Sequence, residues 1–166
     1  MSITRSVLGV LLLGLSGQAQ AASSWETFTS QYSGCSLAYP SYIFTPSQQT
    51  TADGATRFTS GLPEAGMVIA CGSNDKNVSI ADIVRIYLKQ VEGASITYRR
   101  HEQGWAVYSG YQGGLIYYLK AILSKDRRQA CVLELRYPPA NKLELDTIVS
   151  RISKSLRLPQ SGVAAR

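Results

Sequence analysis

The side chains best suited to redox or metal chemistry in this chain are three cysteines and a single histidine. Cys35, Cys71 and Cys131 are far apart in sequence, and they form neither a CxxC motif nor the Cys/His spacing of a zinc site. We therefore expect no metal and no cofactor. In an oxidising compartment, three cysteines predict one disulfide and one leftover thiol. Alternation along the predicted strands places all three cysteines on core-facing sides. The sequence leaves the pairing open; we favour Cys35 with Cys71, and Cys131 as a buried thiol.

Candidate residues for acid–base or nucleophilic catalysis form no recognisable motif. Ser109 precedes a glycine, but Val107 stands where a nucleophile elbow requires a second glycine. His101 lies among charged residues with no evident partner for proton transfer, so a surface histidine is the simpler interpretation. Asp82 and Glu92 are expected on the solvent side of a helix, where local structure does not pair them. We therefore predict no catalytic residue and no enzymatic activity.

Aromatic and basic side chains are the more informative group, because Tyr, Trp and Arg are enriched at protein interfaces. Several aromatic residues gather within residues 105–123, and basic residues cluster at 99–101 and 125–128. Rings in a sheet often pack into the core, and charged runs often form a solvated rim, so these two interpretations stay open. The candidate interface residues are Tyr108, Tyr111, Arg99 and Arg100.

A β-sheet is the element that must position these residues. Apolar and polar residues alternate over 105–112 and again over 115–123, which predicts two strands, and Gly113 and Gly114 between them predict a turn. A third apolar segment, 130–137, follows a charged break. Three sequential antiparallel strands are the economical arrangement of these segments.

The rest of the chain predicts further strands and two helices. The Asp53-Gly54 dipeptide is the strongest hairpin signal. Ser79 with Asp82 three residues later predicts the start of one helix, and Asn141 with an acidic residue at the same spacing predicts the start of the last helix. The other expected elements are a short helix or mobile arm at 23–29 and strands at 34–40, 57–59, 66–72 and 95–103.

The N-terminus has the pattern of a cleavable export signal. Arg5 precedes an apolar run at 7–15, and small residues at positions 19 and 21 form the cleavage site. The apolar run is shorter than the roughly 20 residues that a membrane helix needs. We expect a signal peptide at 1–21, a single α+β domain at 22–158, a flexible tail at 159–166, periplasmic localisation and no membrane span after cleavage.

The net charge of +6 favours acidic partners through long-range attraction but does not identify them. The chain lacks a basic helix and the aromatic-basic strand pattern of proteins that bind single-stranded nucleic acids. We therefore expect no nucleic-acid partner.

The order of elements predicts an α+β fold in which helices flank an antiparallel β-sheet. Residues scattered over 28–157 also resemble the PsbP-like α/β/α sandwich of small exported bacterial proteins. That family includes accessory and adaptor proteins that bind other macromolecules, so the resemblance implies binding and transfers no active-site residue. The resemblance is carried by GCSLAYP at 34–40, Asp53-Gly54 with Phe58, Trp105 with Ser109-Gly110, Tyr117-Tyr118, Tyr137-Pro138, and 148–156 with Arg151 and Ser155.

Taken together, these patterns predict a non-enzymatic periplasmic protein that binds another protein. One specific form of this hypothesis is an immunity protein that neutralises a toxic effector. The first alternative is an envelope accessory module that binds a small molecule or lipid between sheet and helix. The second is a cell-wall hydrolase whose carboxylates come together only in the fold.

Overall fold

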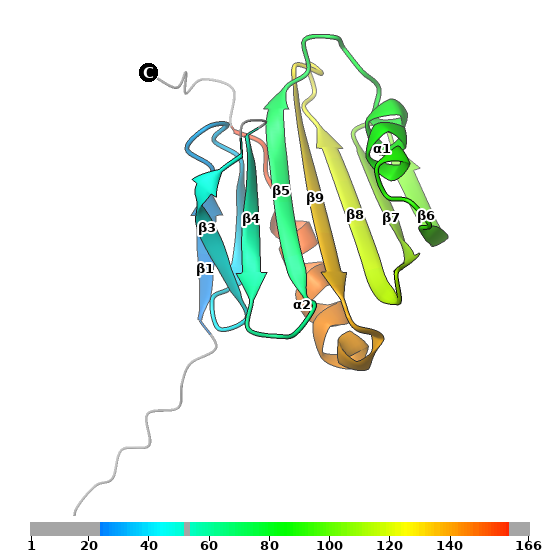
Figure 1. Ribbon diagram of the computed structural model, residues 1–166. Coiled ribbons are helices and arrows are strands. Elements are labelled where there is room, and N and C mark those ends of the chain that lie inside the picture. The colour runs from blue at the N-terminus through cyan, green and yellow to red at the C-terminus, as the bar shows by residue number, and fades with distance from the viewer. Residues whose placement is uncertain (1–23, 52–53, 160–166) are drawn as a thin grey trace, which may run out of the picture.

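The computed structural model describes residues 24–51 and 54–159 (Figure 1). The predicted signal peptide, Asp53 of the hairpin signal, and residues 160–166 of the predicted tail lie outside these ranges. Within them, no helix combines the length and the apolar character needed to cross a membrane. The elements in chain order are β1 (Trp25–Thr29), β2 (Ser36–Pro40), β3 (Phe44–Thr50), β4 (Ala55–Ser60), β5 (Gly66–Ser73), α1 (Ile80–Lys89), β6 (Ser95–Glu102), β7 (Trp105–Gln112), β8 (Leu115–Leu123), β9 (Gln129–Tyr137), a 3-10 turn (Pro139–Asn141) and α2 (Lys142–Ser155).

Seven strands form one antiparallel sheet in the order β3-β4-β5-β9-β8-β7-β6. The predicted run of three sequential strands is confirmed, because β7 pairs with β8 and β8 pairs with β9. Gly113 and Gly114 form the turn between β7 and β8, and both have positive φ angles, which glycine adopts without steric cost. β5 and β9 pair near the centre of the sheet. Strands β4 and β3 lie on one side of this pair, and strands β8, β7 and β6 lie on the other.

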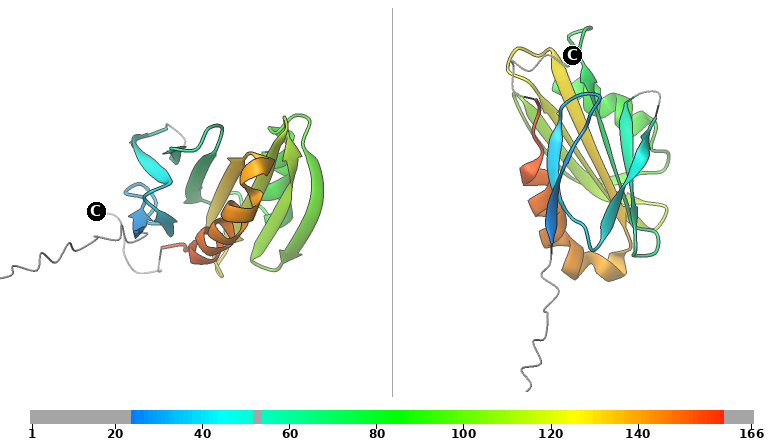
Figure 2. Two further views of the ribbon diagram at one scale, coloured as in Figure 1. Left: turned by 90° about the horizontal axis from the view of Figure 1, so that it is seen from below. Right: turned by 90° about the vertical axis from the view of Figure 1, so that its left-hand side faces the viewer.

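The sheet is covered on both faces, which confirms the predicted α+β sandwich. α1 lies over β7 and β8 on one face. On the other face lie α2 and the separate two-stranded β1–β2 sheet (Figure 2). Two hydrophobic cores result, one under α1 and a larger one under α2 and β1–β2. Because apolar side chains alternate along each central strand, one strand contributes to both cores.

α1 begins where the sequence predicts. The Ser79 side chain accepts a hydrogen bond from the Asp82 backbone N–H at 3.2 Å and donates one to the Asp82 carboxylate at 2.7 Å. The hydrogen bond from Ser79, followed by the one from Arg85, lowers the pKa of Asp82. The capping prediction for this helix is therefore confirmed.

Replacing Ser79 by alanine is expected to lower the free energy of unfolding by about 1 kcal/mol, because the N-terminal turn of α1 loses its capping acceptor. Urea unfolding monitored by circular dichroism measures this loss. Ser79→Thr retains the hydroxyl and serves as the control. A Ser79→Ala protein as stable as the wild type would show that the cap contributes nothing.

One of the predicted elements is wrong. Residues 25–29 form strand β1 and pair with β2, because Trp25 and Phe28 pack against the core beneath the sheet. At residues 25–29, pairing with β2 overrides the local pattern. The predicted start of the last helix is confirmed, since α2 begins at Lys142 directly after Asn141. Asn141 makes no side-chain capping bond, and a 3-10 turn that begins at Pro139 leads into the helix.

Candidate functional site

A groove of about 780 Å³ lies on the α2 side of the sheet, beside the helix. α2 contacts β9 and the separate strand β2, so it leaves much of the same face of β6, β7 and β8 uncovered. Strand alternation directs every second residue of these strands into the opening. The groove is lined by Thr97, Tyr98, Arg100, Gly104, Trp105, Val107, Ser109, Gly110, Tyr111, Ile116, Tyr118, Lys120, Ile122, Tyr137, Lys142, Asp146, Val149, Ser150, Ser153 and Lys154.

Five aromatic side chains line the groove. Tyr98 is 51% exposed and Tyr111 is 45% exposed, so both rings are available to a partner. The Trp105 ring lies 5.3 Å from the Arg100 guanidinium, a cation–π distance. Deeper in the groove, the Tyr118 hydroxyl lies 2.6 Å from the Ser153 hydroxyl of α2. The walls therefore combine apolar area with polar atoms.

The charge of the groove is predominantly positive. Its basic side chains are Arg100, Lys120, Lys142 and Lys154, and among the described lining residues Asp146 is the one carboxylate. Asp146 accepts hydrogen bonds from the Tyr137 hydroxyl at 2.9 Å and from the Lys142 ammonium. This surplus of positive charge attracts acidic groups.

Lys120 is the least exposed of these basic residues, and it links β8 to α2. Its ammonium donates a hydrogen bond to the Ser153 carbonyl at 2.6 Å, near the C-terminal end of the helix. That end carries partial negative charge, so a cation there stabilises the helix. Burial, and next the charge of Arg157, lower the pKa of Lys120.

The structure divides the predicted interface residues between two faces. Tyr111 and Arg100 line the groove, whereas Tyr108 and Arg99 lie on the opposite face beside α1. The four residues therefore do not form one surface. Tyr98 and the lysines of α2 also line the groove, and sequence patterns did not mark them as candidates. Alternation along β7 predicts that Tyr111 and Trp105 share one face of the sheet. No local signal shows which strands face a distant helix.

Ser109 lines the groove, whereas the histidine and the acidic residues lie in several separate parts of the fold. Asp82 pairs with Arg85 on the exposed side of α1, and His101 is exposed on β6. Glu134 lies on the α1 side of the sheet, where it accepts hydrogen bonds from Tyr117 and Arg136. Asp146, in the groove, is engaged with Tyr137 and Lys142.

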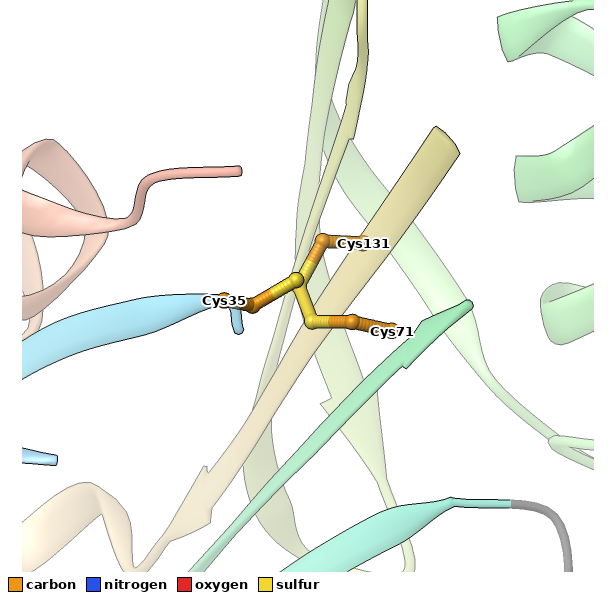
Figure 3. A group of neighbouring side chains, drawn as sticks. All are labelled: Cys35, Cys71 and Cys131. Atoms are coloured by element: carbon orange, nitrogen blue, oxygen red, sulfur yellow. A yellow bond between two sulfur atoms is a disulfide. The ribbon is translucent and has the colours of Figure 1, made fainter. Parts of the chain in front are cut away.

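The three cysteines form a second cluster of interest, in the core under β1–β2 (Figure 3). Their Sγ atoms all lie within 4.8 Å of one another. Cys71 and Cys131 form the disulfide, and Cys35 is a buried free thiol. The favoured pairing of Cys35 with Cys71 is therefore wrong. The reason is register: β5 pairs with β9 so that Cys71 lies directly opposite Cys131.

The prediction that all three cysteines face the core is confirmed, since none is more than 6% exposed. Burial raises the pKa of the Cys35 thiol, so the protonated form predominates at neutral pH. Because Cys71 and Cys131 are joined in the disulfide, Cys35 is the single thiol of this cluster. Thiolate ligands for a metal would require reduction of that bond first.

No known protein family matches this chain by sequence, and no curated protein matches it either. Solved structures do match it. The solution structure of CyanoP, the cyanobacterial PsbP of Synechocystis sp. PCC 6803, aligns with a TM-score of 0.57 at 12% identity, over 88% of this chain and 98% of that one. The Saccharomyces cerevisiae Ran-binding protein Mog1p aligns with a TM-score of 0.58 at 4% identity, over 82% and 96%. The chain therefore has the Mog1/PsbP-like fold.

Proposed function

We propose that this chain is a non-enzymatic, exported protein that binds another protein through the groove beside α2. The observation that carries the proposal is a pair of half-exposed tyrosines above a basic, partly apolar cleft. Side chains of this kind contribute most of the binding energy at protein interfaces, because they bury a large area while keeping a polar group. The fold of the Ran-binding protein Mog1p agrees with a binding role.

The charges of the groove define the chemistry of the partner. The lining residues carry four basic side chains and one carboxylate, and Arg100 also pairs with Glu102 at 3.0 Å, so the net charge is still positive and favours a partner segment that carries acidic groups. The tyrosines and Trp105 favour apolar or aromatic side chains between those acids. The partner is thus an acidic, aromatic-containing segment, and its association should weaken as salt concentration rises.

In its more specific form, the proposal is that the partner is a toxic effector and that this chain is its periplasmic immunity protein. Support comes from the predicted export signal, the small single domain and the lack of a catalytic motif. A toxin gene beside the gene for this chain would favour this form. Co-expression tests it directly: the chain should protect cells from the neighbouring toxin when both are in the periplasm.

The first experiment is affinity capture of the tagged mature protein from periplasmic extract and from cells that express the neighbouring genes, with bound proteins identified by mass spectrometry. A single stoichiometric partner is expected. Its affinity is then measured for the wild type and for the Tyr98→Ala/Tyr111→Ala double variant. We expect at least about tenfold weaker binding, because truncation of two exposed rings removes contact area from the groove.

Tyr42→Ala is the matched control, because Tyr42 is 54% exposed but does not line the groove. It should bind like the wild type, and circular dichroism should show all three proteins folded. Equal affinity of the double variant and the wild type would remove the groove from consideration. A capture that yields no partner from either source would count against protein binding as a whole.

A small molecule or lipid is the second candidate ligand, because the volume of the groove is that of an ordinary ligand pocket. Native mass spectrometry of the purified protein distinguishes the two, since a retained ligand adds a defined mass. The hydrolase hypothesis finds less support. Acid–base hydrolysis of glycans uses two carboxylates, and the described groove residues include Asp146 alone.

A further inference from the structure

A buried thiol lies against a disulfide in this protein, in an arrangement that permits exchange. The Sγ atoms of Cys35, Cys71 and Cys131 are within 4.8 Å of one another, and Figure 3 shows the three side chains converging from separate elements. Cys35 precedes β2, Cys71 lies in β5, and Cys131 lies in β9. No other cysteine occurs in the chain. We propose that the three cysteines form an intramolecular thiol–disulfide exchange site with Cys35 as the attacking group.

The exchange needs no external oxidant or reductant. The Cys35 thiol loses its proton, and the thiolate attacks the Sγ of Cys71 or Cys131. The existing S–S bond breaks, a new one forms to Cys35, and the released thiolate takes up a proton. One disulfide and one thiol are present before and after, so atoms and electrons balance.

The products differ in what the disulfide holds together. The Cys71–Cys131 bond joins two strands that are already paired within the large sheet. A bond from Cys35 to either of them instead ties the β1–β2 layer covalently to that sheet. The described contacts of the β1–β2 layer with the rest of the protein include backbone bonds between Ser36 and Arg157 and the Phe28–Phe58 ring contact. Before exchange, the disulfide links two strands of the same sheet. After exchange, it links the large sheet to the β1–β2 layer.

Burial sets the rate of exchange. It raises the pKa of the Cys35 thiol, so little thiolate is present at neutral pH. The thiolate fraction rises about tenfold per pH unit below the thiol pKa, and the exchange rate should follow it.

Disulfide mapping of the folded protein tests the proposal. Samples are held at about pH 6 or about pH 9, quenched in acid, alkylated under denaturing acid conditions and digested, since only the thiolate exchanges. Trypsin separates the cysteines because Arg57 lies between Cys35 and Cys71, and Arg128 precedes Cys131. At the higher pH, label should move with time from Cys35 to Cys71 or Cys131, with an equal fraction of Cys35 entering a disulfide.

Single serine variants give a second readout. Cys71→Ser and Cys131→Ser should each form a new disulfide between Cys35 and the remaining cysteine, whereas Cys35→Ser should retain the Cys71–Cys131 bond and show no label. Label confined to Cys35 at both pH values, together with two free thiols or intermolecular dimers in Cys71→Ser and Cys131→Ser, would overturn the proposal.

Discussion

Gly110→Ala is expected to destabilise the protein by roughly 3 kcal/mol or more, because the new methyl group has no space. A Cβ at this position would overlap the Ser95 carbonyl oxygen and lie 2.8 Å from the Ile96 Cα, and both are backbone atoms. Backbone cannot move aside as the end of a flexible side chain can. The substitution must therefore push β6 away from β7.

The local pairing explains the close approach. Gly110 lies opposite Ile96, beside a register shift between Ile96 and Tyr98. A bulge of this kind bends the strand, and here it brings the backbone of β6 over position 110. Because Tyr98 and Arg100 follow the bulge and line the groove, displacement of β6 should also weaken partner binding.

Gly72→Ala is the matched control for this prediction. Gly72 also lies within a strand, but its added Cβ would meet no atom within 4 Å. The change in its free energy of unfolding should stay within about 0.5 kcal/mol. Urea unfolding of both variants measures the difference. Equal stabilities of the two alanine variants would show that β6 yields to the extra methyl at little cost.

Raising the pH above about 10 is expected to destabilise the protein, because buried tyrosines resist ionisation. Tyr117 is fully buried, and desolvation followed by the nearby Glu134 carboxylate raises its pKa above the ordinary 10. Tyr137 is 4% exposed, and desolvation followed by its hydrogen bond to Asp146 raises its pKa in the same way.

The sign of the effect follows from proton counts. Above pH 10 the unfolded chain loses the protons of these tyrosines while the folded chain retains them, so the unfolded state binds fewer protons and stability falls as pH rises. Each tyrosine contributes at most about 1.4 kcal/mol per pH unit. Lys120 acts in the opposite direction, because desolvation lowers its folded pKa below 10.5 and the cost of burying its charge disappears as pH rises.

Urea unfolding between about pH 9 and about pH 11.5 measures this slope. The Tyr117→Phe/Tyr137→Phe double variant should lose stability less steeply than its parent, although at neutral pH it gives up two side-chain hydrogen bonds. Both proteins should carry Cys35→Ser, so that thiol–disulfide exchange does not contribute. Parallel stability curves for parent and variant would contradict the assignment of the slope to these two tyrosines.

Much of the fold was predictable because its signals are local. The strand pairs of the β7–β9 meander, the capped start of α1 at Ser79 and the burial of all three cysteines were all predicted. Each depends on residues close in sequence, through alternation, a side chain that reaches three residues along, or turn glycines. The first strand was not predicted, because residues 25–29 become a strand by pairing with β2 and not through a local pattern.

The candidate site was only partly predictable. Composition identified a tyrosine- and arginine-rich region, and Tyr111 and Arg100 do line the groove. The other two candidate interface residues, Tyr108 and Arg99, lie on the opposite face of the sheet, because neighbouring residues on a strand face opposite sides.

The sequence by itself determined the antiparallel sheet with its two helices and the inward direction of the cysteines, because these follow from periodicity along single segments. Only the tertiary structure decided which cysteines pair and which tyrosines share an open face. Cys71 meets Cys131 through the register of β5 on β9, strands separated by much of the chain. The groove exists because α2 packs against β9 and β2 and leaves part of β6–β8 uncovered. Both outcomes depend on packing between distant segments, which no local pattern encodes.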